Sequence, residues 1–163
     1  MSATDDLLRN AESFASGFDQ GTLPMPPARR VAIVACMDAR LNLFSLLGLR
    51  EGDAHVIRNA GGVITADAIR SLAISQRRQA TEEIILIHHT DCGMLTLDDD
   101  DFKRSVVEDT GIKPEWAVEA FGDLDEDVRQ SIARITASPF IPHKNVRGFV
   151  YQVEDGRLRE VDG

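Results

Sequence analysis

The sequence VAIVACMDAR, residues 31–40, decides how this chain folds and where its chemistry lies. Its first five residues are apolar, and polar residues do not alternate with them. This pattern is typical of a strand that is buried on both faces of a parallel sheet. The last five residues place the thiol of Cys36, the carboxylate of Asp38 and the guanidinium of Arg40 just past the strand end. Ligands of open α/β sheets bind beyond the carboxyl ends of the strands, so we expect the functional site here.

A second apolar run, residues 84–87 with the sequence IILI, has the same character. It leads into His88-His89-Thr90-Asp91-Cys92-Gly93, which contains the other of the chain's 2 cysteines. Two cysteines are too few for a disulfide framework. They leave three alternatives: a pair of metal ligands, a redox pair, or two inert core thiols.

The alternation of strand and helix patterns predicts an α/β fold with a mainly parallel sheet. Four parallel strands in the order 2-1-3-4, with an antiparallel edge strand, would place the first and third strands side by side and bring Cys36 beside Cys92. Helices flank this sheet, and a helical, proline-rich arm precedes it. The predicted strands are residues 31–37, 54–58, 83–89, 146–153 and 158–161, and the predicted helices are residues 5–18, 41–47, 65–79, 98–107 and 125–137. Thr4 or Asp5 is the expected cap of the first helix.

The length of 163 residues predicts a single domain, residues 1–163, of which residues 1–28 form the arm. The net charge of −9 excludes a basic surface for nucleic acid. The N-terminus lacks the basic and apolar regions of a secretory signal, and no apolar run approaches the ~20 residues of a membrane span. We therefore expect a cytoplasmic protein with no nucleic-acid or membrane partner, in which thiols stay reduced.

The pattern His89-x-x-Cys92 offers an imidazole and a thiolate within one turn of chain, and Cys36 offers a second thiolate. Two sulfurs and one nitrogen suit zinc, and three protein ligands leave a fourth position for water. This open coordination favours a catalytic site, in which Asp38 and Arg40 can orient the water. Each motif is short and weak alone. Because both follow neighbouring strands, together they favour a metal site over core thiols.

Cys36-x-Asp38-x-Arg40 and His89-x-x-Cys92-Gly93 together resemble the two ligand motifs of the β-class carbonic anhydrases. The intervening Arg58-Asn59-Ala60-Gly61 is similar to that family's segment between the motifs. The likeness runs from residue 31 to residue 93 and is greatest to the short bacterial branch, which is represented in actinobacteria. One departure is the absence, in residues 24–30, of a glutamine that plant-type members use to bind substrate.

The resemblance implies one zinc ion bound by Cys36, His89 and Cys92. The choice of His89 rather than His88 rests on the family's spacing, and His88 is expected on the opposite face of the strand. Asp38 and Arg40 would form the family's dyad, in which Asp38 accepts a hydrogen bond from zinc-bound hydroxide. In a closed state, Asp38 would itself be the fourth ligand.

The resemblance further implies that the backbone N–H of Gly93 holds Asp38. For Arg58 two roles stay open: its position favours a support of the residues around the metal, and the alternative is a salt bridge elsewhere. The implied activity is the reversible hydration of carbon dioxide to bicarbonate and a proton. Two alternatives stay open: hydrolysis of carbonyl sulfide or carbon disulfide at the same zinc site, and a non-catalytic zinc- or bicarbonate-sensing module. The implied assembly is a homodimer, which exchanges the N-terminal helix, or a tetramer.

Overall fold

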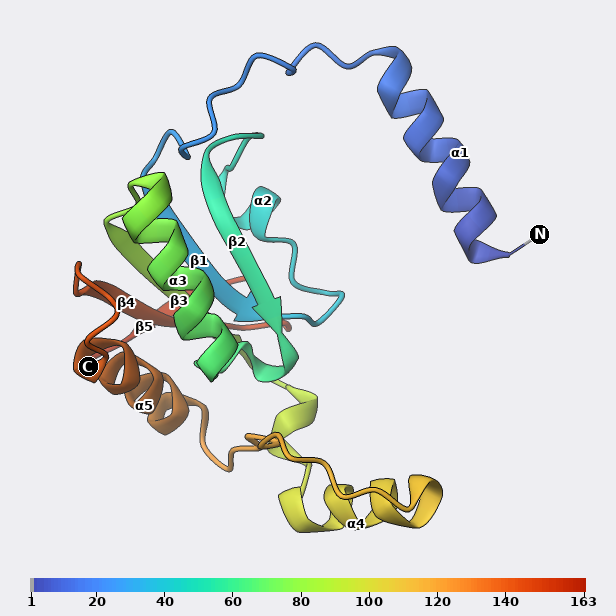
Figure 1. The fold of residues 1–163 in the computed structure, drawn as a ribbon, viewed down its shortest axis with the longest axis vertical. Coiled ribbons are helices and arrows are strands. Elements are labelled where there is room, and N and C mark those ends of the chain that lie inside the picture. The colour runs from blue at the N-terminus through green and yellow to red at the C-terminus, as the bar shows by residue number, and fades with distance from the viewer. Residues whose placement is uncertain (1) are drawn as a thin grey trace.

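The computed structural model describes residues 2–163, and its fold is α/β with one five-stranded sheet (Figure 1). The strands are β1 (Val31–Cys36), β2 (Ala54–Asn59), β3 (Glu83–His89), β4 (Asn145–Tyr151) and β5 (Leu158–Val161). Their order is β2-β1-β3-β4-β5; the first four are mutually parallel, and β5 pairs antiparallel with β4. The predicted order 2-1-3-4 with an antiparallel edge strand is confirmed.

The helices are α1 (Ala3–Ser16), α2 (Leu43–Leu47), α3 (Ala66–Gln79), α4 (Asp99–Thr110) and α5 (Leu124–Ala137), with short 3₁₀ turns η1 (Ala60–Gly62) and η2 (Gly93–Leu95). The expected caps of α1 were wrong. Ser2 caps it instead, because its hydroxyl accepts from Asp5 N–H while the Asp5 carboxylate accepts from Ser2 N–H. The second helix begins two residues later than predicted, since Asn42 caps it.

Strand β1 is buried along its whole length and separates two apolar cores. Ala32 and Val34 pack into the core beneath α3 and α5, whereas Ile33 and Ala35 pack into the core on the side of α2. Successive side chains of a strand point to opposite faces, so a strand covered on both sides needs apolar residues throughout. The continuous apolar run 31–35 has this physical cause.

The carboxyl end of β1 is locked by a close backbone contact with η1. Gly62 has a φ of +71°, and a Cβ atom there would lie 2.8 Å from the Cys36 nitrogen and 2.9 Å from the Ala35 carbonyl carbon. Only glycine satisfies both the left-handed conformation and this approach. The turn that follows β2 therefore fixes the backbone from which Cys36 projects.

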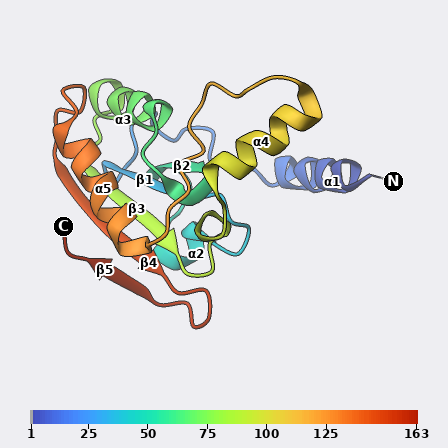
Figure 2. The same ribbon diagram turned by 90° about the horizontal axis from the view of Figure 1, so that it is seen from below.

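Two helices stand away from the sheet. Helix α1 lies at the end of the arm, and Figure 1 shows it well separated from the strands; α4 projects from the opposite end of the same view. The view from below shows that both helices project toward the same side of the body (Figure 2). Neither helix has a buried residue in this chain. Among residues 2–163, no helix is both long enough and apolar enough to cross a bilayer.

Candidate metal centre

Three potential metal ligands meet at the carboxyl edge of the sheet. Cys36 ends β1, His89 ends the neighbouring β3, and Cys92 precedes η2. All three residues are buried, and their ligand atoms lie within 4.8 Å of one another. The two sulfurs are 4.0 Å apart. The sheet order thus brings together the residues that the sequence predicted as a cluster.

The His89 imidazole is oriented for a metal. Its Nδ1 lies 2.7 Å from the carbonyl oxygen of Thr90. Because a carbonyl only accepts, Nδ1 carries the proton and Nε2 presents a lone pair. Nε2 is buried and has no hydrogen-bond partner among the described residues. A buried nitrogen without a partner costs about 1–3 kcal/mol, which coordination would recover. The residues therefore fit a zinc ion.

The two thiols have different proton affinities. The hydrogen bond from Cys92 lowers the pKa of Cys36, although burial opposes this effect. The contact with Cys36 and burial raise the pKa of Cys92. One proton is thus shared between the two sulfurs. Since the thiolate is the form that binds metal, a metal bound by both sulfurs would displace this remaining proton.

Asp38 and Arg40 lie beside this cluster and form a bidentate pair. Arg40 Nη2 is 2.8 Å from Asp38 Oδ2, and Arg40 Nε is 3.0 Å from Asp38 Oδ1. These hydrogen bonds hold the pKa of Asp38 well below its usual range. Asp38 Oδ2 is also 3.7 Å from His89 Nε2. An ionised carboxylate, which only accepts hydrogen bonds, therefore faces the region between the ligands.

Asp91 is a partner of Arg40 to which sequence reasoning assigned no role. Its carboxylate oxygen Oδ2 lies 2.8 Å from Arg40 Nη1, and its carbonyl oxygen lies 3.0 Å from Nη2. Asp91 has a φ of +54°, a conformation that aspartate tolerates better than most residues. Its position between two predicted ligands, His89 and Cys92, was the only signal in the sequence.

Arg58 supports the loop that carries Asp38. Its Nε donates to the Cys36 carbonyl at 2.9 Å, and its Nη2 donates to the Asp38 carbonyl at 2.7 Å. Among the described residues, the hydrogen bonds to the Asp38 carboxylate come from Arg40. The predicted hydrogen bond from Gly93 is not among them, and a role for Gly93 stays a prediction.

His88 points away from the ligand cluster. It is fully buried, and its Nε2 lies 2.6 Å from Asp127 Oδ2 on α5. Its ring also contacts Phe121, with centroids 5.4 Å apart. The alternation of side chains along β3 separates it from His89. His88 therefore joins the strand to the helix layer.

Comparisons with known proteins agree with this geometry. The family model described as carbonic anhydrase matches residues 31–158. The chain is 60% identical to β-carbonic anhydrase 1 of Mycobacterium tuberculosis over 99% of each chain. It is also 39% identical to a carbon disulfide hydrolase of Acidithiobacillus thiooxidans, over 83% of this chain and 78% of the relative.

Among solved structures, a carbonic anhydrase of Streptococcus mutans aligns with a TM-score of 0.92 and 41% identity, covering 99% of each chain. The metal-free form of a carbon disulfide hydrolase aligns with a TM-score of 0.75 and 30% identity, covering 98% of this chain and 90% of the other. The sequence match extends through the ligand motifs and the whole sheet, and the structural match includes the arm. This chain belongs to the β-class carbonic anhydrases, a family of lyases.

Proposed function

We propose that this chain catalyses the reversible hydration of carbon dioxide to bicarbonate and a proton, with zinc held by Cys36, His89 and Cys92. The observation that carries the proposal is the buried, unpartnered Nε2 of His89 grouped with two sulfurs within 4.8 Å. A neutral imidazole and two thiols are a donor set that zinc prefers. Zinc bound in such a three-ligand site would lower the pKa of a coordinated water to about 7.

Asp38 orients the attacking water in this proposal. Both of its oxygens are engaged by Arg40, which keeps the carboxylate ionised and fixed in direction. An ionised carboxylate accepts the water's O–H and so turns an oxygen lone pair toward the carbon atom of the substrate. Arg40 thus acts through Asp38. The two hydrogen bonds from Arg58 to the carbonyls of Cys36 and Asp38 hold the loop in place, and we retain Gly93 as a further candidate support.

The proposed activity is tested on protein loaded with zinc and measured for metal content. We expect about one zinc per chain and carbon dioxide hydration in stopped-flow assays. Carbon disulfide hydrolysis is the second candidate, because carbon disulfide hydrolases lie among the relatives at 34–39% identity. Hydrogen sulfide release from carbon disulfide or carbonyl sulfide, measured beside hydration, distinguishes the two. A zinc-loaded protein inactive on every substrate would contradict both and favour a sensing module.

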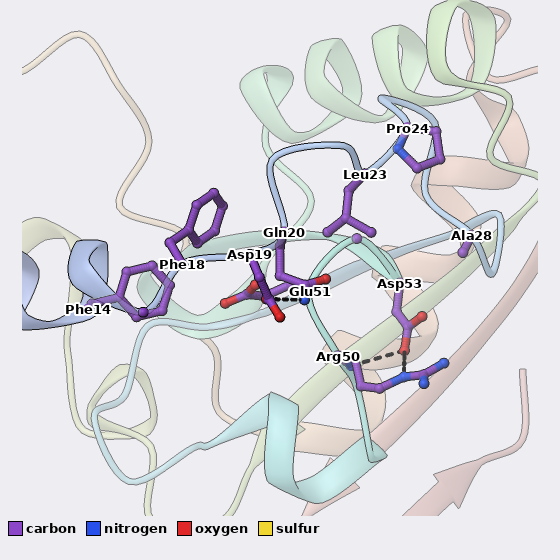
Figure 3. A pocket seen from close by; sticks show the side chains of 12 residues that line it. Phe14, Phe18, Asp19, Gln20, Leu23, Pro24, Ala28, Arg50, Glu51 and Asp53 are labelled. Atoms are coloured by element: carbon purple, nitrogen blue, oxygen red, sulfur yellow. Dashed lines mark hydrogen bonds and ion pairs between the residues drawn. The ribbon is translucent and has the colours of Figure 1, made fainter.

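We further propose that the chain is a homodimer, with tetramers as the alternative, and that α1 packs on a second copy. The apolar side chains of α1 and its extension are exposed: Leu7 by 66%, Leu8 by 58%, Phe14 by 59% and Phe18 by 50%. A cavity of about 630 Å³ lies between the arm and the loop of residues 50–53. Phe14 and Phe18 are among the side chains that line it (Figure 3). A continuous exposed apolar face of this kind is typical of an interaction surface.

Phe14→Glu is expected to convert the dimer into a monomer, because it places a charge within the apolar face of α1. Analytical ultracentrifugation measures the change. Ser13→Glu adds the same charge on the opposite face of the helix and is expected to leave the assembly unchanged. A dimer that survives Phe14→Glu at every protein concentration would rule out packing through this helix.

We also propose that residues 1–163 form a single domain and that the protein acts in the cytoplasm. The support for the single domain is that the strands between residues 31 and 161 form one sheet, to which residues 2–28 add only the arm. The support for the second is the pair of cysteines proposed as zinc ligands, since a reducing compartment keeps such thiols free.

A further inference from the structure

We propose that Thr90 and Glu154 are positioning residues that hold the His89 imidazole ready for the metal. The inference rests on the proposed zinc site and adds to it a support from the turn between β4 and β5. The His89 Nδ1–H donates to the carbonyl of Thr90 at 2.7 Å, so the direction of that carbonyl sets the tautomer and the tilt of the ring.

Thr90 is bound by three hydrogen bonds to one short segment. Its backbone N–H donates to the Tyr151 carbonyl at 2.9 Å. Its hydroxyl donates to Glu154 Oε2 at 2.8 Å and accepts from the Val153 N–H at 3.0 Å. Every polar group of Thr90 except its carbonyl is therefore held by residues 151–154, and the carbonyl is left for His89.

The segment that holds Thr90 is itself fixed. Tyr151 ends β4 and lies opposite His89 in the parallel register of β3 and β4. Beyond it, the turn closes through hydrogen bonds from Gln152 N–H to the Arg157 carbonyl and from Gly156 N–H to the Gln152 carbonyl, both 2.8 Å. The segment that holds Thr90 is therefore anchored to the sheet and is not a free loop.

The peptide after Thr90 is restrained from the other side as well. Asp91 adopts the left-handed conformation, and its own carbonyl accepts from Arg40 Nη2 at 3.0 Å. The Thr90 carbonyl thus lies between two anchored residues. Rotation of this peptide would break hydrogen bonds on both sides. We infer that the hydrogen bonds of the half-buried Thr90 hydroxyl to the β4–β5 turn fix the direction of the Thr90 carbonyl. That carbonyl in turn fixes the orientation of the His89 imidazole.

A purely structural role gives a different expectation. If the hydroxyl only joins the turn to β3, its removal lowers the stability of the fold and leaves the imidazole unchanged. A positioning role changes the tautomer of His89 in metal-free protein and the affinity for zinc. Supports of metal-bound histidines typically contribute about 10–100-fold to metal affinity.

The test compares Thr90→Val with Thr90→Ser, which retains the hydroxyl, and with Thr110→Val. Thr110 donates its hydroxyl to the Val106 carbonyl at 2.7 Å within α4 and is the matched control for a lost threonine hydroxyl. Imidazole ¹⁵N shifts in metal-free protein report the tautomer of His89. Chelator competition gives the dissociation constant of zinc, and the visible absorption of the Co²⁺ form reports ligand geometry.

We expect Thr90→Val to weaken zinc binding by about tenfold to a hundredfold, to shift the Co²⁺ bands and to mix the His89 tautomers. Thr90→Ser and Thr110→Val are expected to match wild type. Wild-type values of all three readouts in folded Thr90→Val would overturn the inference. If Thr90→Val does not fold, the exposed Glu154→Ala decides the matter, with a smaller effect in the same direction expected and wild-type values overturning it. Because the tautomer is read without metal or substrate, this outcome is independent of the proposed activity.

Discussion

Replacing Cys36 by alanine is expected to abolish both zinc binding and carbon dioxide hydration. The change removes one of three protein ligands and leaves His89 and Cys92, which do not complete a zinc site. We expect zinc content to fall close to zero in dialysed protein and hydration to fall by roughly a thousandfold or more, since the activation of water depends on the metal. Metal analysis and stopped-flow hydration measure the two effects.

The matched control is Met37→Ala. Met37 is the next residue in the chain, but its side chain is 64% exposed. We expect this variant to keep its zinc and its activity. Retention of stoichiometric zinc by folded Cys36→Ala would contradict the ligand assignment, whereas loss of both in Met37→Ala would mean that the loop tolerates no change.

Asp38→Asn is expected to lower kcat/KM for hydration by roughly 10²–10³-fold while zinc stays bound. The amide keeps the shape of the carboxylate, but one of its two terminal atoms donates instead of accepting, so it no longer orients water reliably. Arg40 lowers the pKa of Asp38, which is therefore ionised throughout the range from about pH 6 to about pH 9. The ratio of wild-type to variant activity should accordingly stay constant across that range.

Asp101→Asn provides the comparison for this variant. Asp101 pairs with Arg104 at 2.8 Å on the surface of α4, a helix that carries none of the predicted metal ligands. Loss of the Asp101–Arg104 pair should leave the hydration rate unchanged. An exposed pair contributes at most about 1 kcal/mol to stability, and this one does not contact the predicted metal ligands. An activity ratio for Asp38→Asn that approaches one toward acidic pH would indicate that Asp38 titrates there and would contradict the assigned role.

The sequence predicted the strands because their apolar runs are strong, local signals, and it predicted the cluster because two weak motifs follow two of these strands. The apolar runs at residues 31–35 and 84–87 mark buried strands, and the order 2-1-3-4, which was adopted for a sheet of this class, makes these two strands neighbours. Polar groups placed after two neighbouring strands must then meet at one edge of the sheet. The meeting of Cys36 with Cys92 could therefore be anticipated without coordinates.

The supports of the site could not be predicted in the same way. The contacts of Arg40 with Asp91 and of Thr90 with Glu154 join positions 51 and 64 residues apart through side-chain geometry. Neither pair has a periodic pattern that would distinguish it from ordinary surface residues. The cap of α1 and the start of α2 were misplaced for a related reason, since several neighbouring polar residues can each cap a helix and the choice depends on local backbone angles.

The position of Arg40 between two aspartates has a consequence for how readily Asp38 moves. A cation left alone when its carboxylate departs must be solvated again, and this cost opposes the departure. Arg40 retains Asp91 through two hydrogen bonds, so the withdrawal of Asp38 leaves a paired cation. Each 1.4 kcal/mol of cost avoided in this way shifts the ratio of the two arrangements about tenfold. The Asp91 carboxylate, which directly precedes Cys92 in the chain, would therefore lower the cost of separating Asp38 from Arg40.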